Sequence, residues 1–242
     1  MESLITTTSP CLYLIPNIIG SAPIEWQLPE NNKSIIRSLS YFIAEDLKSC
    51  RQLLKLSGYQ DISAAQIVEY NEHNIDEPTE DFFIPMKQGH SIGLVSEAGC
   101  PVIADPGDKI VRWAHLHQIN VVPLVGASSI MLAIMAAGLS GNNFAFNGYL
   151  PIETHERVRK IKELEQFSFH KKQAQFFIEA PYRNQKLLGL LINILQSETW
   201  LSIASNILSD SPIILTKKVN NWKRSSLTDI QKKPCVFGIL KD

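Results

Sequence analysis

The chain has 242 residues, of which 45% are hydrophobic and 19% are charged. This composition suits one large or two medium globular domains and excludes a globally disordered chain. The formal net charge is −1, which argues against a protein whose main role is high-affinity binding of nucleic acid.

The charge is spread unevenly along the chain. Residues 1–150 contain 8 Lys and Arg against 15 Asp and Glu, whereas residues 151–242 contain 15 against 9. Such asymmetry is typical either of a face that meets a polyanion or of solvated helix surfaces. Composition alone favours the solvated surfaces.

The sequence predicts a cytoplasmic protein with reduced cysteines and without a membrane segment or a bound metal. No apolar run reaches the roughly 18 residues that a spanning helix needs. Residues 1–16 lack the basic segment and the cleavage pattern of a signal peptide. The four cysteines are too widely spaced for a zinc or redox pair, and the six histidines show no ligand spacing.

Hydrophobic patterning in the first half predicts alternating strands and helices. Strands are expected at 12–15, 41–44, 62–70, 91–96 and 119–124, and helices at 45–56, 76–89, 109–117 and 128–137. This alternation predicts an α/β layer with a mostly parallel sheet. Ligands bind such sheets beyond the carboxyl ends of the strands.

The second half starts again after a break at 147–151. Helices are expected at 153–166 and 184–196, and strands at 174–178, 200–204, 213–216 and 235–240. We therefore expect two domains, residues 1–124 and residues 125–242, of which the second is a smaller α/β domain.

Three loops after successive strands predict a small-molecule cleft. They span 16–20, 96–107 and 126–129. Gly99 and Gly107 permit positive φ, and the small residues of the third loop place N–H donors at a helix start, which suits an anionic group. Neither a G-x-G-x-x-G fingerprint nor a P-loop occurs, which disfavours nicotinamide and nucleoside triphosphate ligands.

Short segments between residues 11 and 190 also carry a resemblance to a known family. They are LYLIPNIIG (12–20), FIAED (42–46), NE (71–72), VSEAGCP (95–101), DPG (105–107), 121–139, GYLP (148–151) and EAPYR (179–183). In this order they resemble the ribosomal small-subunit RNA 2′-O-ribose methyltransferase I family, a branch of the tetrapyrrole methylase superfamily.

The resemblance implies a homodimer of two α/β domains that binds S-adenosylmethionine in a cleft between the domains. It further implies methyl transfer to the ribose 2′-hydroxyl of ribosomal RNA in the small subunit. Carried over by position, the cofactor contacts fall on Pro16, Gly99, Cys100, Pro101, Ile103, Gly126, Ser128, Ser129, Glu179 and Leu208.

The chain departs from the family at 205–209, where SNILS stands in place of a charged segment. Two alternatives to an RNA methyltransferase therefore stay open. One is a methyltransferase for a small molecule such as a tetrapyrrole. The other is a cofactor-binding relative without catalysis.

Methyl transfer to a hydroxyl needs a group that removes a proton, and carboxylates in loops or at strand ends are the candidates. Glu45, Glu97 and Glu179 are the preferred bases. Asp105 is expected to be structural, because aspartate before Pro-Gly favours a turn. Cys100 has no activating partner in the sequence, so we expect a wall residue rather than a nucleophile.

The basic second half offers an RNA surface as one interpretation of its charge. Lys217, Lys218, Lys223 and Arg224 surround Trp222 in the sequence. An aromatic ring among cations suits the stacking of an unpaired base. An ordinary solvated surface explains the same pattern equally well.

Overall fold

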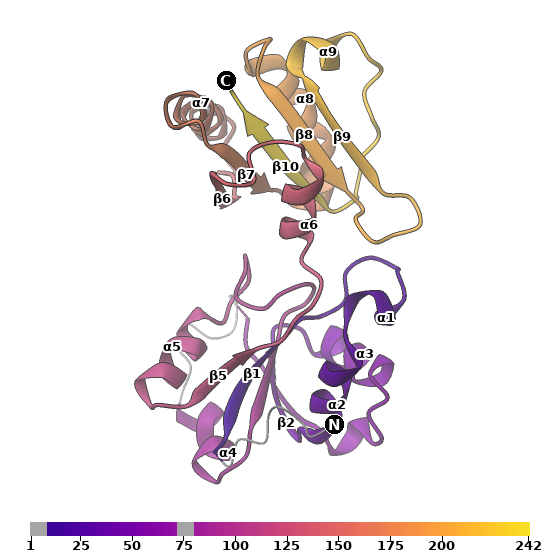
Figure 1. Cartoon of the computed structure of the whole chain (residues 1–242), viewed down its shortest axis with the longest axis vertical. Helices are drawn as coiled ribbons and strands as arrows, with labels where there is room; N and C mark the ends of the chain where they lie inside the picture. The colour runs from indigo at the N-terminus through magenta and orange to yellow at the C-terminus, as the bar shows by residue number, and fades with distance from the viewer. Residues whose placement is uncertain (1–8, 72–79) are drawn as a thin grey trace. The chain divides into compact units, whose positions relative to one another are not determined.

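The computed structural model describes residues 9–71 and 80–242. The chain divides between Ser128 and Ser129 into two compact units, called unit 1 and unit 2 here (Figure 1). In the described residues, each unit contains a five-stranded sheet with helices on both faces. The predicted α/β class is confirmed.

Unit 1 alternates strands and helices. Its elements are β1 (Cys11–Ile15), α1 (Ile24–Gln27), α2 (Glu30–Ser38), β2 (Tyr41–Ala44), α3 (Leu47–Leu56), a 3₁₀ helix (Ile62–Ala64), β3 (Gln66–Glu69), a second 3₁₀ helix (Glu80–Phe83), α4 (Ile84–Lys87), β4 (Ile92–Val95), α5 (Asp108–Leu116) and β5 (Asn120–Pro123).

The sheet of unit 1 has the strand order β3-β2-β4-β1-β5, and all of its paired strands run parallel. Successive residues of a strand point to opposite faces, so each strand serves two cores. Cys11, Tyr13 and Ile15 pack with α2 and α3, whereas Leu12 packs with α5 on the other face. Figure 1 shows these helices on opposite sides of the sheet.

The strand order creates a switch point between β1 and β4. From β1 the chain continues to β2 on one side, and from β4 it continues to β5 on the other side. The connections that leave these two neighbouring strands therefore diverge, which opens a crevice at their carboxyl ends. The predicted ligand loops, 16–20 and 96–107, follow these two strands.

Unit 2 contains a mixed sheet. Its elements are α6 (Ser129–Ala136), β6 (Phe144–Tyr149), α7 (Thr154–Lys171), β7 (Ala174–Ile178), a 3₁₀ helix (Pro181–Arg183), α8 (Asn184–Ile194), β8 (Trp200–Ser205), β9 (Ile213–Lys218), α9 (Val219–Lys223) and β10 (Cys235–Leu240).

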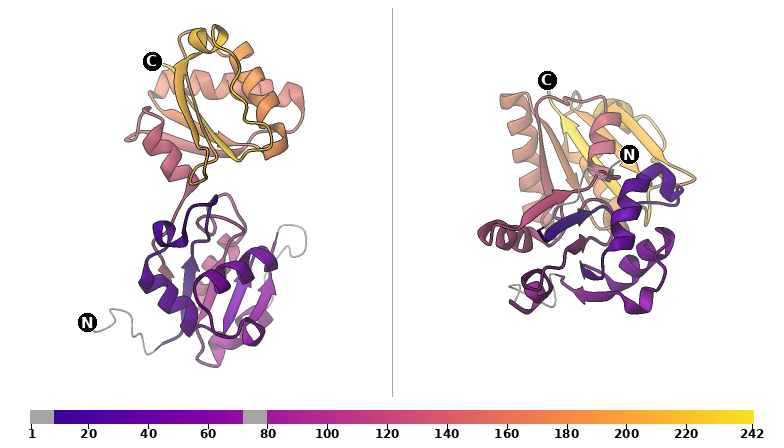
Figure 2. Two further views of the ribbon diagram at one scale, coloured as in Figure 1. Left: turned by 90° about the vertical axis from the view of Figure 1, so that its right-hand side faces the viewer. Right: turned by 60° about the horizontal axis from the view of Figure 1, so that its bottom comes forward.

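The sheet of unit 2 has the order β6-β7-β10-β8-β9, in which only β6 and β7 pair in parallel among the described strands. Helices α7 and α8 cover one face, and α6 packs on the other (Figure 2). Because β7 and β8 both run antiparallel to β10, their carboxyl ends lie at the same edge of the sheet.

Three predictions of local structure are corrected. The strand expected over 62–70 begins only at Gln66, because the Asp61 side chain accepts a hydrogen bond from Ser63 N and starts a 3₁₀ turn. The break expected at 147–151 lies partly in β6, and the sequence pattern predicted no helix where α2 lies. Residues 76–79 of the expected fourth helix lie outside the described residues.

Candidate functional site

In unit 1 the loops after β1 and β4 are joined by a short antiparallel bridge. Asn17 N donates to Gly99 O at 2.8 Å, and Gly99 N donates to Asn17 O at 3.2 Å. The buried Asn17 amide also donates to Ser96 O and Glu97 O, at 2.9 and 3.0 Å. Asn17 thus ties the two loops together, although the sequence offered it only as part of a motif.

The loop after β5 packs against the same two loops. A Cβ on Gly126 would lie 2.4 Å from Pro16 Cβ and 2.6 Å from its Cγ, so only glycine permits this approach. Cys100 Sγ lies 3.5 Å from Ala127 O. The structure therefore brings together the predicted cofactor positions Pro16, Gly99, Cys100 and Gly126 within unit 1.

The loop between β4 and α5 holds an unusual backbone. Gly99 and Gly107 have φ of 78° and 131°, and two residues with side chains, Val102 and Ala104, have φ of 74° and 68°. Left-handed backbone is disfavoured for valine, and such strain concentrates at ligand-binding sites. Ile103 lies between these two residues in the sequence, and half of its surface is exposed.

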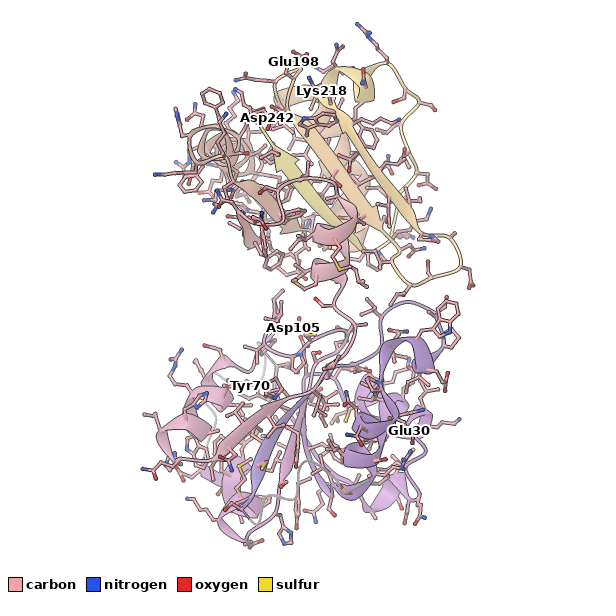
Figure 3. The ribbon with its side chains drawn as sticks, viewed as in Figure 1. Glu30, Tyr70, Asp105, Glu198, Lys218 and Asp242 are labelled. Atoms are coloured by element: carbon pink, nitrogen blue, oxygen red, sulfur yellow. The ribbon has the colours of Figure 1, made fainter. Side chains whose placement is uncertain are left out.

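Three carboxyl groups gather beside this loop. Glu97 N donates to Glu45 Oε2 at 2.9 Å, which joins the segment after β2 to the segment after β4. Burial, together with the charges of Glu45 and Glu97, raises the pKa of Asp105 to about 7. Figure 3 labels Asp105 in this loop. The sequence did not prefer Asp105 as a base, because its ionisation depends on burial and on charges that are distant in sequence.

Cys100 is a poor nucleophile in this setting. Burial raises the pKa of its thiol, and a hydrogen bond with Ser128 offsets only part of that rise. A neutral thiol favours the wall residue that the sequence suggested. The bond with Ser128 also connects the predicted cofactor positions of two loops.

In unit 2, Glu179 follows β7 and is held by two arginines. Arg183 Nη2 lies 2.6 Å from Glu179 Oε1, and Arg157 Nη2 lies 3.1 Å from Oε2 in an ion pair without regular hydrogen-bond geometry. The Glu179 side chain has no exposed surface. Its observed contacts therefore hold loops together, and its catalytic role stays a prediction.

The other predicted positions of unit 2 lie at the start of α6 and after β8. Ser129 is the first residue of α6, next to Ser128. Leu208 has φ of 57° and follows Asn206, whose φ is 58°. Leu208 and Glu179 both follow strands that end at the same edge of the sheet. The cofactor cleft expected between the two domains stays a prediction, as do the cofactor roles of Pro101 and Ile103.

The predicted stacking role of Trp222 is wrong. Its side chain is only 2% exposed, and its Nε1 donates to Leu201 O at 2.9 Å. The ring belongs to the core of unit 2 and cannot face a base. Helix α9 turns it inward while the neighbouring Lys223 and Arg224 remain exposed.

Clusters of metal ligands and membrane-spanning helices are both absent from the part of the chain that the structure describes. No group of three or more His, Cys, Asp or Glu in residues 9–71 and 80–242 could hold a metal ion. Within the same residues, no helix has both the length and the apolar surface to cross a membrane.

The chain matches several curated proteins with one name, whereas no protein-family model matches it. It is 30% identical over 199 residues to "Ribosomal RNA small subunit methyltransferase I" of Mesorhizobium japonicum, with 82% of this chain and 64% of the relative covered. For the protein of that name in Xylella fastidiosa the identity is 31% over 191 residues, with 79% and 66% covered.

The protein of the same name in Streptococcus pyogenes serotype M3 is 30% identical over 223 residues, with 92% of this chain and 71% of the relative covered. The chain thus spans about two thirds of the length of these relatives. The order of motifs, the two α/β units and these identities agree: the chain belongs to the ribosomal RNA small subunit methyltransferase I family, as a divergent member within the tetrapyrrole methylase superfamily.

Proposed function

We propose that the chain is an S-adenosylmethionine-dependent methyltransferase that acts on ribosomal RNA of the small subunit, at a ribose 2′-hydroxyl. The observation that carries the proposal is the convergence of three loops at the switch point of the unit 1 sheet. The names of the relatives support the RNA substrate. We also propose that the protein is cytoplasmic and that it forms a homodimer. Light scattering of the purified chain, which measures its molar mass, tests the homodimer.

The chemistry of the loops fits this cofactor. Its amino-acid end carries a carboxylate, which suits the hydroxyls of Ser128 and Ser129 and the N–H donors at the start of α6. The exposed Ile103 offers an apolar contact for an adenine ring. When bound, the sulfonium supplies an activated methyl group.

Asp105 is the residue of this chain best suited to accept the proton of a hydroxyl. A base with a pKa of about 7 is partly ionised at neutral pH and still has a useful affinity for a proton. Glu45 and Glu97 strengthen that affinity, because their negative charges favour protonated Asp105. The loops would contribute mainly by orientation, which supplies up to about 7–11 kcal/mol in favourable cases.

The test is transfer of labelled methyl groups from S-adenosylmethionine to small-subunit RNA that lacks ribose methylation. We expect label in 2′-O-methylated nucleosides, with a rate that rises as the pH increases through about 7. At saturating cofactor, Asp105→Asn should lower kcat by about 100-fold or more. Asp108→Asn is the matched control, because Asp108 is an exposed carboxylate on α5 that pairs with the likewise exposed Arg112.

Each alternative outcome has a distinct meaning. If the cofactor binds and label appears only in small molecules of a cell extract, the RNA substrate is wrong. If the cofactor binds and no label reaches RNA or metabolites, the chain is a relative without catalysis. If Asp105→Asn retains the wild-type kcat, Asp105 is not the base.

A further inference from the structure

Two tyrosines lie exposed where the parallel strands β6 and β7 of unit 2 end. Tyr149 is the last residue of β6 and is 60% exposed, and Tyr182 follows β7 and is 61% exposed. Ile152, in the connection after β6, is 70% exposed. Tyr149 pairs with Ile178 in the parallel register of β6 and β7, so both connections leave the sheet at the same end. Exposed aromatic and apolar side chains that share one end of a sheet are typical of a binding surface.

A buried ion-pair cluster fixes this surface. The Arg157 side chain donates to Pro151 O at 2.7 Å and to Ile152 O at 3.0 Å, and it pairs with Glu179. Glu179 in turn holds Arg183, the neighbour of Tyr182. The connection after β6 and the turn after β7 are thereby tied to one carboxylate, so little conformational freedom remains to be lost on binding.

The side chains of Arg183 and Tyr182 contact each other within that cluster. The guanidinium carbon lies 4.8 Å from the centroid of the Tyr182 ring, and Arg183 Nη1 donates to the Tyr182 hydroxyl. The hydrogen bond to Glu179 raises the pKa of Arg183, so the guanidinium stays charged. Two arginines face one glutamate here, which leaves the cluster with a net positive charge.

We propose that Tyr182 and Arg183, with Tyr149 at the same end of the sheet, form a platform on which an unpaired base of the RNA substrate stacks. Aromatic rings and guanidinium planes both stack on bases, and the positive charge suits the phosphates that flank an unpaired nucleotide. This inference rests on the proposed function for its partner, an RNA whose unpaired bases can leave the stack and lie on aromatic and guanidinium planes. The platform takes the role that the buried Trp222 cannot fill.

The test measures the affinity of the full chain for purified small-subunit ribosomal RNA over a range of salt concentrations. Tyr182→Leu should weaken binding by about tenfold, the size expected for one lost base stack. Tyr182→Phe should bind like the wild type, because it keeps the ring. The slope of log affinity against log salt should stay unchanged in both variants, since no phosphate contact is removed.

Phe167→Leu is the matched control, because Phe167 is another partly exposed ring of unit 2, at 46%. It should leave RNA affinity unchanged, and all variants should keep the wild-type melting temperature and cofactor affinity. The proposal is overturned if Tyr182→Leu binds as tightly as the wild type, if Tyr182→Phe loses as much, or if Phe167→Leu loses as much. It is also overturned if the wild type does not bind the RNA.

The outcome is separable from that of the proposed function. If the platform variants behave as expected while no methyl group is transferred, the platform stands and the proposed catalysis fails. If methyl transfer to RNA proceeds in the wild type and Tyr182→Leu leaves RNA affinity and KM for RNA unchanged, only the platform fails.

Discussion

At the scale of single residues, Asp105 is the carboxyl group whose pKa the fold raises in the loop between β4 and α5. Its raised pKa reflects burial first, and then the charges of Glu45 and Glu97. The folded state therefore holds the Asp105 proton more tightly than the unfolded state, in which an aspartate titrates near 4. The contribution of this group to stability is complete below about pH 4 and is lost as the pH rises to about 7.

Replacement of Asp105 by Asn should stabilise the protein above pH 7. Asn resembles the protonated carboxyl group and carries no charge that burial disfavours. We expect a gain of about 1 kcal/mol at pH 8, allowing for solvent screening of a partly exposed group, and no gain below about pH 4. Urea unfolding of both proteins across this pH range measures the difference. A variant that is destabilised equally at all pH values would show that the carboxyl group serves a fixed hydrogen bond.

The sequence predicts which loops meet, but it does not predict the environment of two single residues, Asp105 and Trp222. The positions of Pro16, Gly99, Cys100 and Gly126 in contacting loops follow from the motif order and the parallel strands that carry them. The raised pKa of Asp105 does not follow from them, because it arises first from burial and then from the charges of Glu45 and Glu97, which lie 60 and 8 residues away along the chain. The burial of Trp222 does not either, since a helix of five residues shows too little periodicity to reveal its inner face.

At the scale of elements, the contact between the first and third loops depends on one glycine. Gly126→Ala places a methyl group 2.4 Å from Pro16 Cβ, and the proline ring cannot rotate away. We expect a loss of about 1–3 kcal/mol in the free energy of unfolding and a weaker affinity for S-adenosylmethionine. Chemical denaturation and calorimetric titration measure the two effects.

Gly141→Ala is the control for that substitution, because a Cβ there meets nothing within 4 Å and the backbone φ is not positive. It should change stability by less than about 0.5 kcal/mol. Wild-type stability and affinity in Gly126→Ala would contradict the close packing of the two loops.

The turn after β7 depends on the Glu179 carboxylate. Glu179→Gln removes the charge that compensates Arg157 and Arg183, whose side chains are 10% and 22% exposed. Breaking a buried pair leaves an uncompensated charge, so we expect a loss of about 3 kcal/mol in the free energy of unfolding. Glu163→Gln, which breaks the exposed pair with Lys160, should cost less than about 1 kcal/mol.

Equal effects of the two glutamate substitutions would contradict a structural role of the buried cluster. If Glu179→Gln folds normally and loses only methyl transfer, the catalytic role predicted for Glu179 gains support instead.

The elements with regular patterns were predictable, and the missed ones have identifiable reasons. Strands β1, β2, β4 and β5 are apolar runs that end in turn residues. Strand β6 contains Asn147 and Gly148, and it continues only through an irregular register between Phe146 and Tyr149. Helix α2 has a polar sequence, and its buried Asn32 donates to Val125 O, a contact distant in sequence.

At the scale of the whole molecule, two α/β units and the ordered motifs could be anticipated from the sequence. The expected boundary followed residue 124, and the units separate after Ser128, where the third loop meets α6. The charge asymmetry also divides near the start of unit 2, which carries the excess of Lys and Arg. The acceptor that we propose for the methyl group is recognised by surfaces that no short motif describes.

Calorimetric titration of the purified chain with S-adenosylmethionine tests the central claim most directly. We predict saturable binding at a ratio of one cofactor to one chain, with weaker binding in Gly126→Ala and unchanged binding in Gly141→Ala. No heat of binding at millimolar cofactor, with a folded protein, would contradict the proposal that this chain is an S-adenosylmethionine-dependent methyltransferase.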